Sequence, residues 1–341
     1  MKFGLIICTF KRPAALEKLL ESVTRQQLHP EEILVVDGSP GNETREMIKK
    51  KGYPNLQYYK VREEDRGLTR QRNYGISRTG DNVDVICFLD DDTVLEPEYF
   101  EHLIGTYHKY SDAVGVGGYI VDEVEWKRAE QPAGFDEFWI DGYKRKIGSR
   151  NLLRKKLGLL SNRPPGVMPE FSNGLSIGFL PPTGKTYPVE FFMGGVASYR
   201  KELFEQISFS NYFVGYGLYE DMDFCLRASR IGQLYVNTAA CLYHYHENSG
   251  RPNRFDYGKM VVRNGWYVWR VKYQSPSLKS RMKWNSIALI LTVVRIGNII
   301  STTKRKEAFT ESLGRIVGWF SLIFDKPVVG SYRANKIAEI E

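Results

Sequence analysis

The sequence contains few cysteines and lacks the short motifs of several common enzyme classes. Its 341 residues include only four cysteines, none in CxxC spacing, which argues against a structural zinc site or a disulfide scaffold. Cys8, Cys87 and Cys225 lie in or beside apolar runs, so we expect buried thiols in a reducing compartment. GxGxxG, Walker A and HExxH sequences are also absent, which disfavours a dinucleotide dehydrogenase, a P-loop enzyme and a zincin.

Positive charge is concentrated in the last part of the chain. The whole sequence has 48 Lys and Arg against 40 Asp and Glu, a net charge of +8. From residue 251 onward there are 17 basic and 6 acidic residues, or +11, so the first 250 residues carry 31 and 34, or −3. The main body is therefore not basic, and nucleic-acid binding is the least expected function, although aromatic and basic residues alternate in residues 266–273.

Short apolar runs alternate with helical patterns over the first 100 residues. Alternation of buried strands with helices of this length predicts an α/β fold with a mainly parallel sheet flanked by helices. We expect no signal peptide, because the first apolar run is too short and basic residues follow it. The predicted strands cover residues 3–8, 33–36, 56–61 and 85–89, and the predicted helices cover 14–23, a segment ending at 51 and one beginning near 68.

The middle of the chain has little regular patterning. Residues 122–188 include a basic segment and a Pro/Gly-rich stretch, and we expect loops that cover a cleft. Regular patterning returns at residues 191–195, and a helix is expected after Arg200.

Two apolar segments follow in the basic tail. Residues 287–300, interrupted by Arg295, would form about 21 Å of helix, and residues 316–323 are shorter, against a hydrocarbon core of about 30 Å. We expect a helical extension that lies in the membrane interface without crossing it, and a helical subdomain packed on the body is the alternative. Basic residues expected near anionic headgroups are Lys279, Arg281, Lys283 and residues 304–306.

Charged residues gather where predicted strands end. Asp90, Asp91 and Asp92 follow a strand expected to be buried, and Asp37 ends an earlier strand at the same edge of the sheet. Ligands of open parallel sheets bind beyond this edge, and a divalent cation such as Mg²⁺ or Mn²⁺ would relieve the repulsion within the triplet. A solvated acidic turn is the alternative. Three arginines in residues 66–72 are suited to contact a diphosphate, or form an ordinary polar helix face.

Two later pairs of residues could also carry chemistry. Glu220 and Asp221 lie among aromatic and apolar residues at an expected helix start, where a carboxylate can have a raised pKa and act as a general base. Capping of the helix is the alternative. His244 and His246 alternate on an expected strand and so share a face, where one could complete a metal site with Asp92, or both could be structural.

Taken in order, these elements resemble the family 2 glycosyltransferases, inverting enzymes of the GT-A fold. The resemblance covers about residues 3–250, and it depends on the order and spacing of motifs that are each modest. The motifs are IICTFKRP at 6–13, VVDGS at 35–39, GLTRQRNYGI at 67–76, FLDDD at 88–92, GG at 194–195 and YEDMD at 219–223.

The resemblance implies a role for each matching residue. Asp221 would be the general base with Glu220 supporting it, while Asp92 of the family's DXD motif and His244 would ligate Mg²⁺ or Mn²⁺, with His246 an open alternative. The implied nucleotide-sugar site consists of Thr9 and Arg12 beside the nucleotide, Asp37 at the base, Arg72 at the diphosphate or base, Asp90 at the ribose, Asp91 in the same site, and Gly194 and Gly195 where the backbone approaches the donor sugar.

The implied activity is inverting transfer of a sugar from a UDP-, dTDP- or GDP-linked donor to a hydroxyl acceptor, expected to be a lipid-linked glycan or a polysaccharide precursor. Residues 1–120 would bind the nucleotide sugar, 121–250 would bind the acceptor and hold the base, and 251–341 would attach to the cytoplasmic face of a membrane. One alternative is a processive polysaccharide synthase, whose Gln-x-x-Arg-Trp signature is missing. Another is a non-catalytic, membrane-associated protein that binds a sugar nucleotide or glycan, against which the intact Glu220-Asp221 pair counts.

Overall fold

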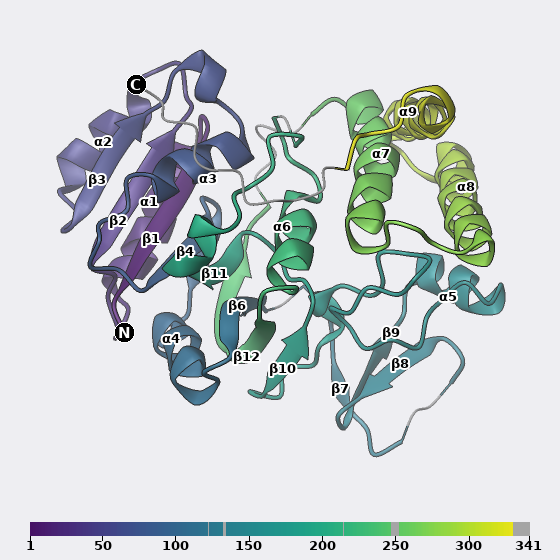
Figure 1. The fold of residues 1–341 in the computed structure, drawn as a ribbon, viewed down its shortest axis with the longest axis horizontal. Coiled ribbons are helices and arrows are strands. Elements are labelled where there is room, and N and C mark those ends of the chain that lie inside the picture. Colours follow the sequence, from purple (N-terminus) through teal and green to yellow (C-terminus); the bar gives the residue numbers. More distant parts are fainter. Residues whose placement is uncertain (122, 132–133, 214, 247–251, 330–341) are drawn as a thin grey trace. The chain divides into compact units, whose positions relative to one another are not determined.

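The structure is a computed structural model that describes residues 1–121, 123–131, 134–213, 215–246 and 252–329 (Figure 1). The described residues form two compact units. The first unit comes from Met1–Val124 and Leu180–Gly250, and the second from Glu125–Phe179 and Arg251–Ser331. Each unit is therefore assembled from two separated stretches of the chain.

The first unit is built on a mixed, mainly parallel sheet in the order β10-β12-β6-β11-β4-β1-β2-β3, with β5 paired to β12. β1 pairs in parallel with β2 and β4, and β11 is antiparallel to both of its neighbours. The predicted α/β fold with a mainly parallel sheet is confirmed. The strands are β1 (Phe3–Thr9), β2 (Glu32–Asp37), β3 (Leu56–Lys60), β4 (Val85–Asp90), β5 (Thr93–Leu95), β6 (Ala113–Ile120), β10 (Thr186–Val189), β11 (Val196–Arg200) and β12 (Gln233–His244).

Helices flank this sheet, and local sequence explains where several of them begin and end. α1 has a proline at its start, and α2 has glutamates in its first turn, three lysines in its last turn and Gly52 in the left-handed conformation after it. The segment after Arg200 forms only the short 3₁₀ helix η3, so the helix predicted there was wrong. The elements are α1 (Pro13–Thr24), α2 (Glu43–Lys51), η1 (Glu63–Asp65), α3 (Leu68–Ile76), α4 (Tyr99–Lys109), η3 (Lys201–Glu205) and α6 (Glu220–Ala228).

The register of the parallel strands positions the site. Thr9 at the end of β1 is opposite Asp37 of β2, and Cys8 is opposite Asp90 of β4. The strands are almost fully buried up to this row. The predicted common edge for Asp37 and the acidic triplet is therefore confirmed.

The second unit contains regular structure that the sequence patterns did not reveal. Residues 122–188 were predicted to be loops, but β8 and β9 form a hairpin there, with β7 on the other side of β9. Asp141 and Gly142, with φ of 51° and 77°, make the tight turn, and an Asp-Gly pair is a strong hairpin signal that could have been used. The elements are β7 (Lys127–Arg128), β8 (Glu137–Ile140), β9 (Tyr143–Lys146), α5 (Ser149–Lys156) and η2 (Ile177–Phe179).

Three long helices complete the second unit: α7 (Arg254–Lys272), α8 (Leu278–Ser301) and α9 (Arg305–Phe324). α7 and α9 approach closely at glycines, since a Cβ at Gly258 would lie 2.1 Å from the carbonyl oxygen of Glu311. α8 has 24 residues and a length of about 36 Å, so the predicted 14-residue helix was too short. Among the described residues, α8 alone has the length and apolar composition to cross a membrane.

Candidate active site

A cavity of about 160 Å³ lies in the first unit where the strands end. Residues from α3, β4, the turn before β11, the start of α6 and the end of β12 line it, so widely separated parts of the sequence meet there. Seven lining residues are among those predicted from the sequence: Arg72, Asp90, Gly194, Gly195, Glu220, Asp221 and His244.

A buried contact between Arg72 and the carboxyl group of Glu220 forms one wall of this cavity. Arg72 Nη1 donates to Glu220 Oε1 at 2.6 Å, and Arg72 Nη2 lies 3.8 Å from Asp90 Oδ1. The guanidinium also lies over the rings of Phe88 and Phe209, at 5.6 and 5.2 Å from their centroids. Because Arg72 is only 3% exposed, its charge is shared between two carboxylates and held in place by aromatic faces.

Glu220 is in an unusual environment for a carboxylate. It is 5% exposed, and its second oxygen, Oε2, has no hydrogen-bond partner among the described residues. Burial raises the pKa of Glu220 to about 8, although the Arg72 charge opposes this shift. Such a group holds a proton more readily than an ordinary glutamate at neutral pH.

Asp221 is oriented by the backbone. Its Oδ2 accepts from the N–H of Gly194 at 3.1 Å, and its Oδ1 accepts from the N–H of Met222 at 2.7 Å. Burial raises the pKa of Asp221, while these two hydrogen bonds lower it in part. Tyr219, immediately before α6, has a φ of 71°, a strained conformation that turns the chain so that Glu220 and Asp221 begin the helix.

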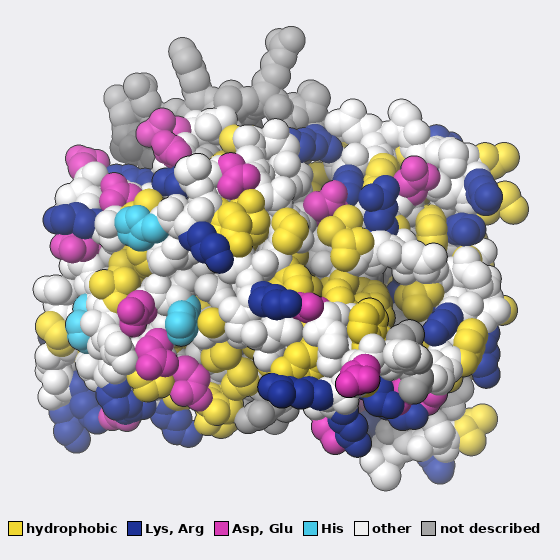
Figure 2. Space-filling view, turned by 90° about the horizontal axis from the view of Figure 1, so that it is seen from below, with side chains coloured by type: hydrophobic (Ala, Val, Ile, Leu, Met, Phe, Trp, Pro, Cys, Tyr) yellow, Lys and Arg dark blue, Asp and Glu magenta, His cyan; other side chains and the backbone are white. Residues whose placement is uncertain are grey.

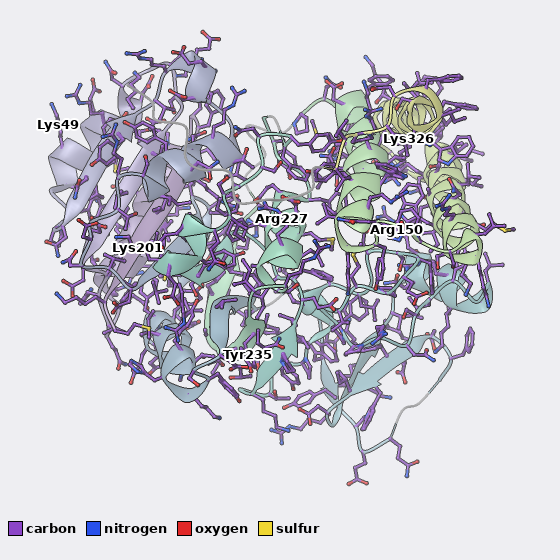
Figure 3. The ribbon with its side chains drawn as sticks, viewed as in Figure 1. Lys49, Arg150, Lys201, Arg227, Tyr235 and Lys326 are labelled. Carbon is purple, nitrogen blue, oxygen red and sulfur yellow. The ribbon has the colours of Figure 1, made fainter. Side chains whose placement is uncertain are left out.

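The start of α6 is fixed from within the helix. Arg227, labelled in Figure 3, donates to Asp223 Oδ2 from Nη2 at 2.6 Å and from Nε at 3.2 Å. Its Nη1 also donates to the carbonyl oxygen of Ser208 at 2.9 Å. This buried pair anchors the helix on the loop before it, so the two carboxylates of the cavity have a rigid support.

Gly194 and Gly195 leave room for this charge cluster. A Cβ at Gly194 would lie 2.7 Å from Arg72 Nη1 and 2.8 Å from Glu220 Oε1. A Cβ at Gly195 would lie 2.2 Å from Asp90 Oδ2. The structure therefore requires both glycines for packing of the protein's own side chains, whether or not a donor sugar also approaches them.

The rest of the acidic triplet is tied to the first strand and the first helix. Thr9 Oγ1 donates to Asp91 Oδ2 at 2.7 Å, and Arg12 Nη1 donates to Asp91 Oδ1 at 2.9 Å and lies 3.5 Å from Asp92 Oδ2. Burial raises the pKa of Asp91 to about 6, and Arg12 lowers it in part. The contacts of Thr9 and Arg12 with Asp91 thus fix the turn that follows β4. These three residues do not line the cavity.

Three side chains have the donor set of a divalent-metal site, and two of them, Asp90 and His244, line the cavity, whereas Asp92 does not. Asp90, Asp92 and His244 each offer an atom within 4.8 Å of the others, and His244 Nε2 lies 3.0 Å from Asp92 Oδ1. Two carboxylate oxygens and one imidazole nitrogen fit Mn²⁺ and are acceptable to Mg²⁺. His244 and Asp92, which the sequence offered as partners in a metal site, are therefore in contact.

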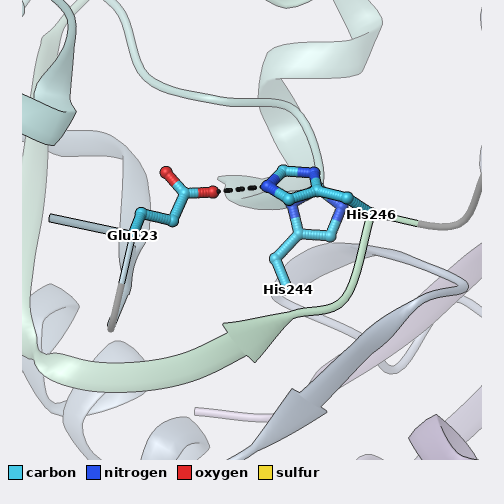
Figure 4. A group of neighbouring side chains, drawn as sticks. All are labelled: Glu123, His244 and His246. Carbon is cyan, nitrogen blue, oxygen red and sulfur yellow. Dashed lines mark hydrogen bonds and ion pairs between the residues drawn. The ribbon is translucent and has the colours of Figure 1, made fainter.

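His246 lies beside His244, but not because the two alternate along one strand, as was predicted. β12 ends at His244, and His246 follows with a φ of 52°, so the two do not alternate along a strand. Their ring centroids are nevertheless 4.1 Å apart. His246 Nε2 pairs with Glu123 Oε1 at 2.9 Å, which makes a second group of possible ligands with His244 (Figure 4).

Asp37 lies apart from the cavity. It is fully buried, its Oδ1 accepts from the N–H of Ser39 at 2.7 Å, and its Oδ2 accepts from the hydroxyl of Tyr58 at 2.8 Å. Sequence reasoning missed Tyr58. The available signal was its alternation with Leu56 on β3, which puts both side chains on the same, partly buried face of the strand. Sequence reasoning also missed the apolar lining of the cavity, which is Leu68, Ile120, Met193 and Val196.

Comparison with known proteins gives relatives of one kind. Residues 5–208 match glycosyl transferase family 2. A glucosyl-dolichyl phosphate glucuronosyltransferase of Haloferax volcanii is 32% identical over 148 residues, which are 42% of this chain and 45% of that protein. The chain spans less than half of the length of the curated relatives it matches.

Two solved structures share the fold. The mannosyltransferase PcManGT of Pyrobaculum calidifontis, in complex with GDP-Man and Mn²⁺, has a TM-score of 0.53 at 12% identity, over 96% of this chain and 88% of that one. GalNAc-T7 with UDP, GalNAc and Mn²⁺ has a TM-score of 0.52 at 13% identity, over 86% of this chain and 57% of that one. With its GT-A architecture and a family match over more than half of its length, the chain belongs to glycosyl transferase family 2.

Proposed function

We propose that the chain is an inverting glycosyltransferase that moves a sugar from a nucleotide-diphosphate donor to an acceptor hydroxyl by metal-assisted single displacement. The observation that carries this proposal is the meeting of Asp221 with Asp90 and His244 around one cavity. A candidate base and candidate cation ligands that line the same cavity suit a reaction in which an acceptor oxygen attacks as a diphosphate leaves.

In this proposal Asp221 takes the proton from the acceptor hydroxyl. Its two backbone hydrogen bonds hold the carboxylate in one orientation, and its raised pKa brings its basicity nearer to neutral pH. Arg72 holds Glu220 and Asp90 in position and is not reserved for the donor. Its guanidinium already pairs with Glu220 and lies near Asp90. The acceptor oxygen forms the new bond to the anomeric carbon while the bond to the diphosphate oxygen breaks, so the configuration inverts.

The residues present fit a divalent cation. Asp92 and His244 would hold Mg²⁺ or Mn²⁺, with Asp90 close enough to join them. When bound, the cation would neutralise charge on the leaving diphosphate as a Lewis acid. Support for this class of donor and metal comes from the related folds, since PcManGT binds GDP-Man and Mn²⁺.

The remaining donor contacts are proposed on the family pattern. Thr9, Asp37 and Asp91 lie at or directly after the ends of β1, β2 and β4, Arg12 directly precedes α1, and none of the four lines the cavity. We propose that they contact the nucleotide, with residues 1–120 forming the donor half and 121–250 the acceptor half. A UDP, dTDP or GDP donor is compatible with this arrangement.

The acceptor is proposed to be a lipid-linked glycan at the cytoplasmic face of a membrane. The Haloferax volcanii relative is named for a dolichyl phosphate substrate, and the apolar helix α8 is consistent with membrane association. The last 91 residues also carry a net charge of +11, with 17 basic and 6 acidic residues, which favours an anionic surface.

The test compares Asp221→Asn with the wild type. First, a thermal-shift screen of UDP-, dTDP- and GDP-sugars with and without Mn²⁺ identifies the donor. We then expect Asp221→Asn to keep the donor-induced shift and to lose turnover by about 10²- to 10⁴-fold. Turnover close to that of the wild type would contradict the assignment of the base. Binding of a donor without turnover by the wild type, over a broad set of acceptors, would favour the non-catalytic alternative.

A further inference from the structure

The last two helices form an antiparallel pair. Near the start of α8, Asn285 Oδ1 accepts from Trp319 Nε1 near the end of α9 at 3.0 Å. Near the end of α8, Arg295 Nη2 lies 2.8 Å from Glu311 Oε2 near the start of α9. These two contacts fix the relative direction and rotation of the helices.

Each helix of the pair exposes an apolar stripe. The members recur every three or four residues, with one seven-residue step in α8, so each set lies on one side of its helix. Successive residues of an α-helix are rotated by about 100° around its axis, so the position of each stripe can be measured from the residues that contact the other helix. By this measure both stripes lie on the same side of the antiparallel pair and form one surface, which we call the apolar face. Its members on α8 are Leu278, Met282, Leu289, Val293, Ile296 and Ile300, and on α9 Phe309, Leu313, Val317, Phe320 and Phe324, all at least 39% exposed.

An exposed face of this kind is uncommon on a soluble surface and indicates contact with a partner or a membrane. Crossing of the bilayer by α8 is disfavoured by what α8 packs against. Glu311, only 4% exposed, pairs with Arg295 of α8 and with Arg315 of α9, and α9 begins with a charged turn. A crossing α8 would bring these charges toward hydrocarbon, where each ionised side chain is expensive.

Positive charge lies next to the apolar face. An open cavity of about 380 Å³ is lined by Arg254, Lys304, Arg305 and Lys306, together with Thr310, which directly follows Phe309 of the apolar face. Glu307 compensates for only one of these charges, through its 2.8 Å contact with Arg254. Figure 2 also shows basic and apolar side chains interspersed along its right-hand edge, where both α5 and α8 lie in Figure 1. Basic side chains beside an apolar surface complement anionic headgroups above acyl chains.

We propose that α8 and α9 lie flat in the interface of an anionic phospholipid bilayer, with the apolar face inserted among acyl chains and the basic cavity over a lipid phosphate. This inference deepens the proposed association of the chain with a membrane. It rests on that association and does not depend on the proposed glycosyl transfer. It assigns α8 an interfacial position instead of a transmembrane one.

Flotation of the full chain with vesicles tests the surface. We expect the wild type to float with phosphatidylcholine vesicles that contain phosphatidylglycerol and to bind far less to phosphatidylcholine alone. Lys304→Ala/Arg305→Ala/Lys306→Ala should weaken binding to the anionic vesicles at least tenfold, because each basic side chain contributes about fivefold near such a surface. Lys18→Ala/Lys49→Ala/Lys50→Ala removes the same charge from exposed positions of the first unit and should leave binding unchanged; Lys49 is labelled in Figure 3.

The apolar face is tested in the same assay. Val293→Asp/Phe320→Asp, at positions 65% and 53% exposed, should abolish flotation without lowering the thermal midpoint. Leu28→Asp/Ile231→Asp, at two exposed apolar positions of the first unit, is the matched control. Equal flotation of the wild type and both tail variants would overturn the proposal. Flotation does not need a nucleotide sugar, so an inactive enzyme that still floats would contradict only the proposed activity.

Labelling decides whether α8 crosses. Lys279→Cys and Ser301→Cys place a thiol at an exposed position at each end of the helix, and the wild type gives the background from the native cysteines. In sealed inside-out vesicles from expressing cells, we expect a membrane-impermeant maleimide to label both variants. Labelling at one end only would show that α8 spans the bilayer and would refute its interfacial position.

Discussion

The buried carboxyl of Glu220 should make the stability of the protein depend on pH in a recognisable way. Its pKa is raised by burial to about 8 in the folded protein, against an ordinary value of 4.5. The folded state therefore binds one more proton than the unfolded state between these values. The stabilisation from this group is complete below about pH 4.5 and is lost as the pH rises through about 8.

The substitution that isolates this effect is Glu220→Gln. Glutamine has the same size, its carbonyl oxygen can accept from Arg72 as Glu220 Oε1 does, and it does not titrate. One bound proton changes the free energy of unfolding by about 1.4 kcal/mol per pH unit. Between pH 5.5 and 7.5 the wild type should thus lose about 2–3 kcal/mol more than the variant.

Urea unfolding followed by tryptophan fluorescence measures this difference, since the chain has six tryptophans. Titrating groups that do not interact with Glu220 contribute equally to both proteins and cancel in the comparison. A difference between wild type and Glu220→Gln that stays constant over this pH range would refute the reasoning. It would mean that Arg72 keeps Glu220 ionised throughout, and that the ion pair outweighs burial.

Three further outcomes test other parts of the structure. Gly195→Ala should lower the free energy of unfolding by about 1–3 kcal/mol because its methyl group would overlap a carboxylate, whereas Gly105→Ala, with open space around it, should be neutral or stabilising; equal midpoints in thermal unfolding would be unexpected. His244→Ala should weaken Mn²⁺ binding in calorimetry at least tenfold while His246→Ala leaves it within about twofold, and the reverse order would move the metal to the other histidine. Gly258→Ala should destabilise the second unit by about 1–3 kcal/mol, because its Cβ would meet a carbonyl oxygen of α9, and an unchanged thermal midpoint would contradict this packing.

The sheet and the edge at which its carboxylates gather were predictable because local patterns encode them. The apolar runs that became β1, β2 and β4 end in turn chemistry, and a parallel arrangement necessarily brings their carboxyl ends together. The same reasoning placed Asp37 and the acidic triplet at one edge. It failed for the middle segment, where β8 and β9 have only four residues each, and for the helix expected after Arg200.

The sequence by itself determined the order of strands and helices, the edge at which carboxylates gather and the family pattern. Only the tertiary structure decided that Arg72 pairs with Glu220, 148 positions away, that Gly194 makes room for this pair and that Gly195 makes room for Asp90. It also showed that residues 125–179 pack with the C-terminal helices in one unit. Strand and helix patterns depend on neighbours a few residues apart, whereas these contacts depend on how distant segments are packed, which local propensity does not encode.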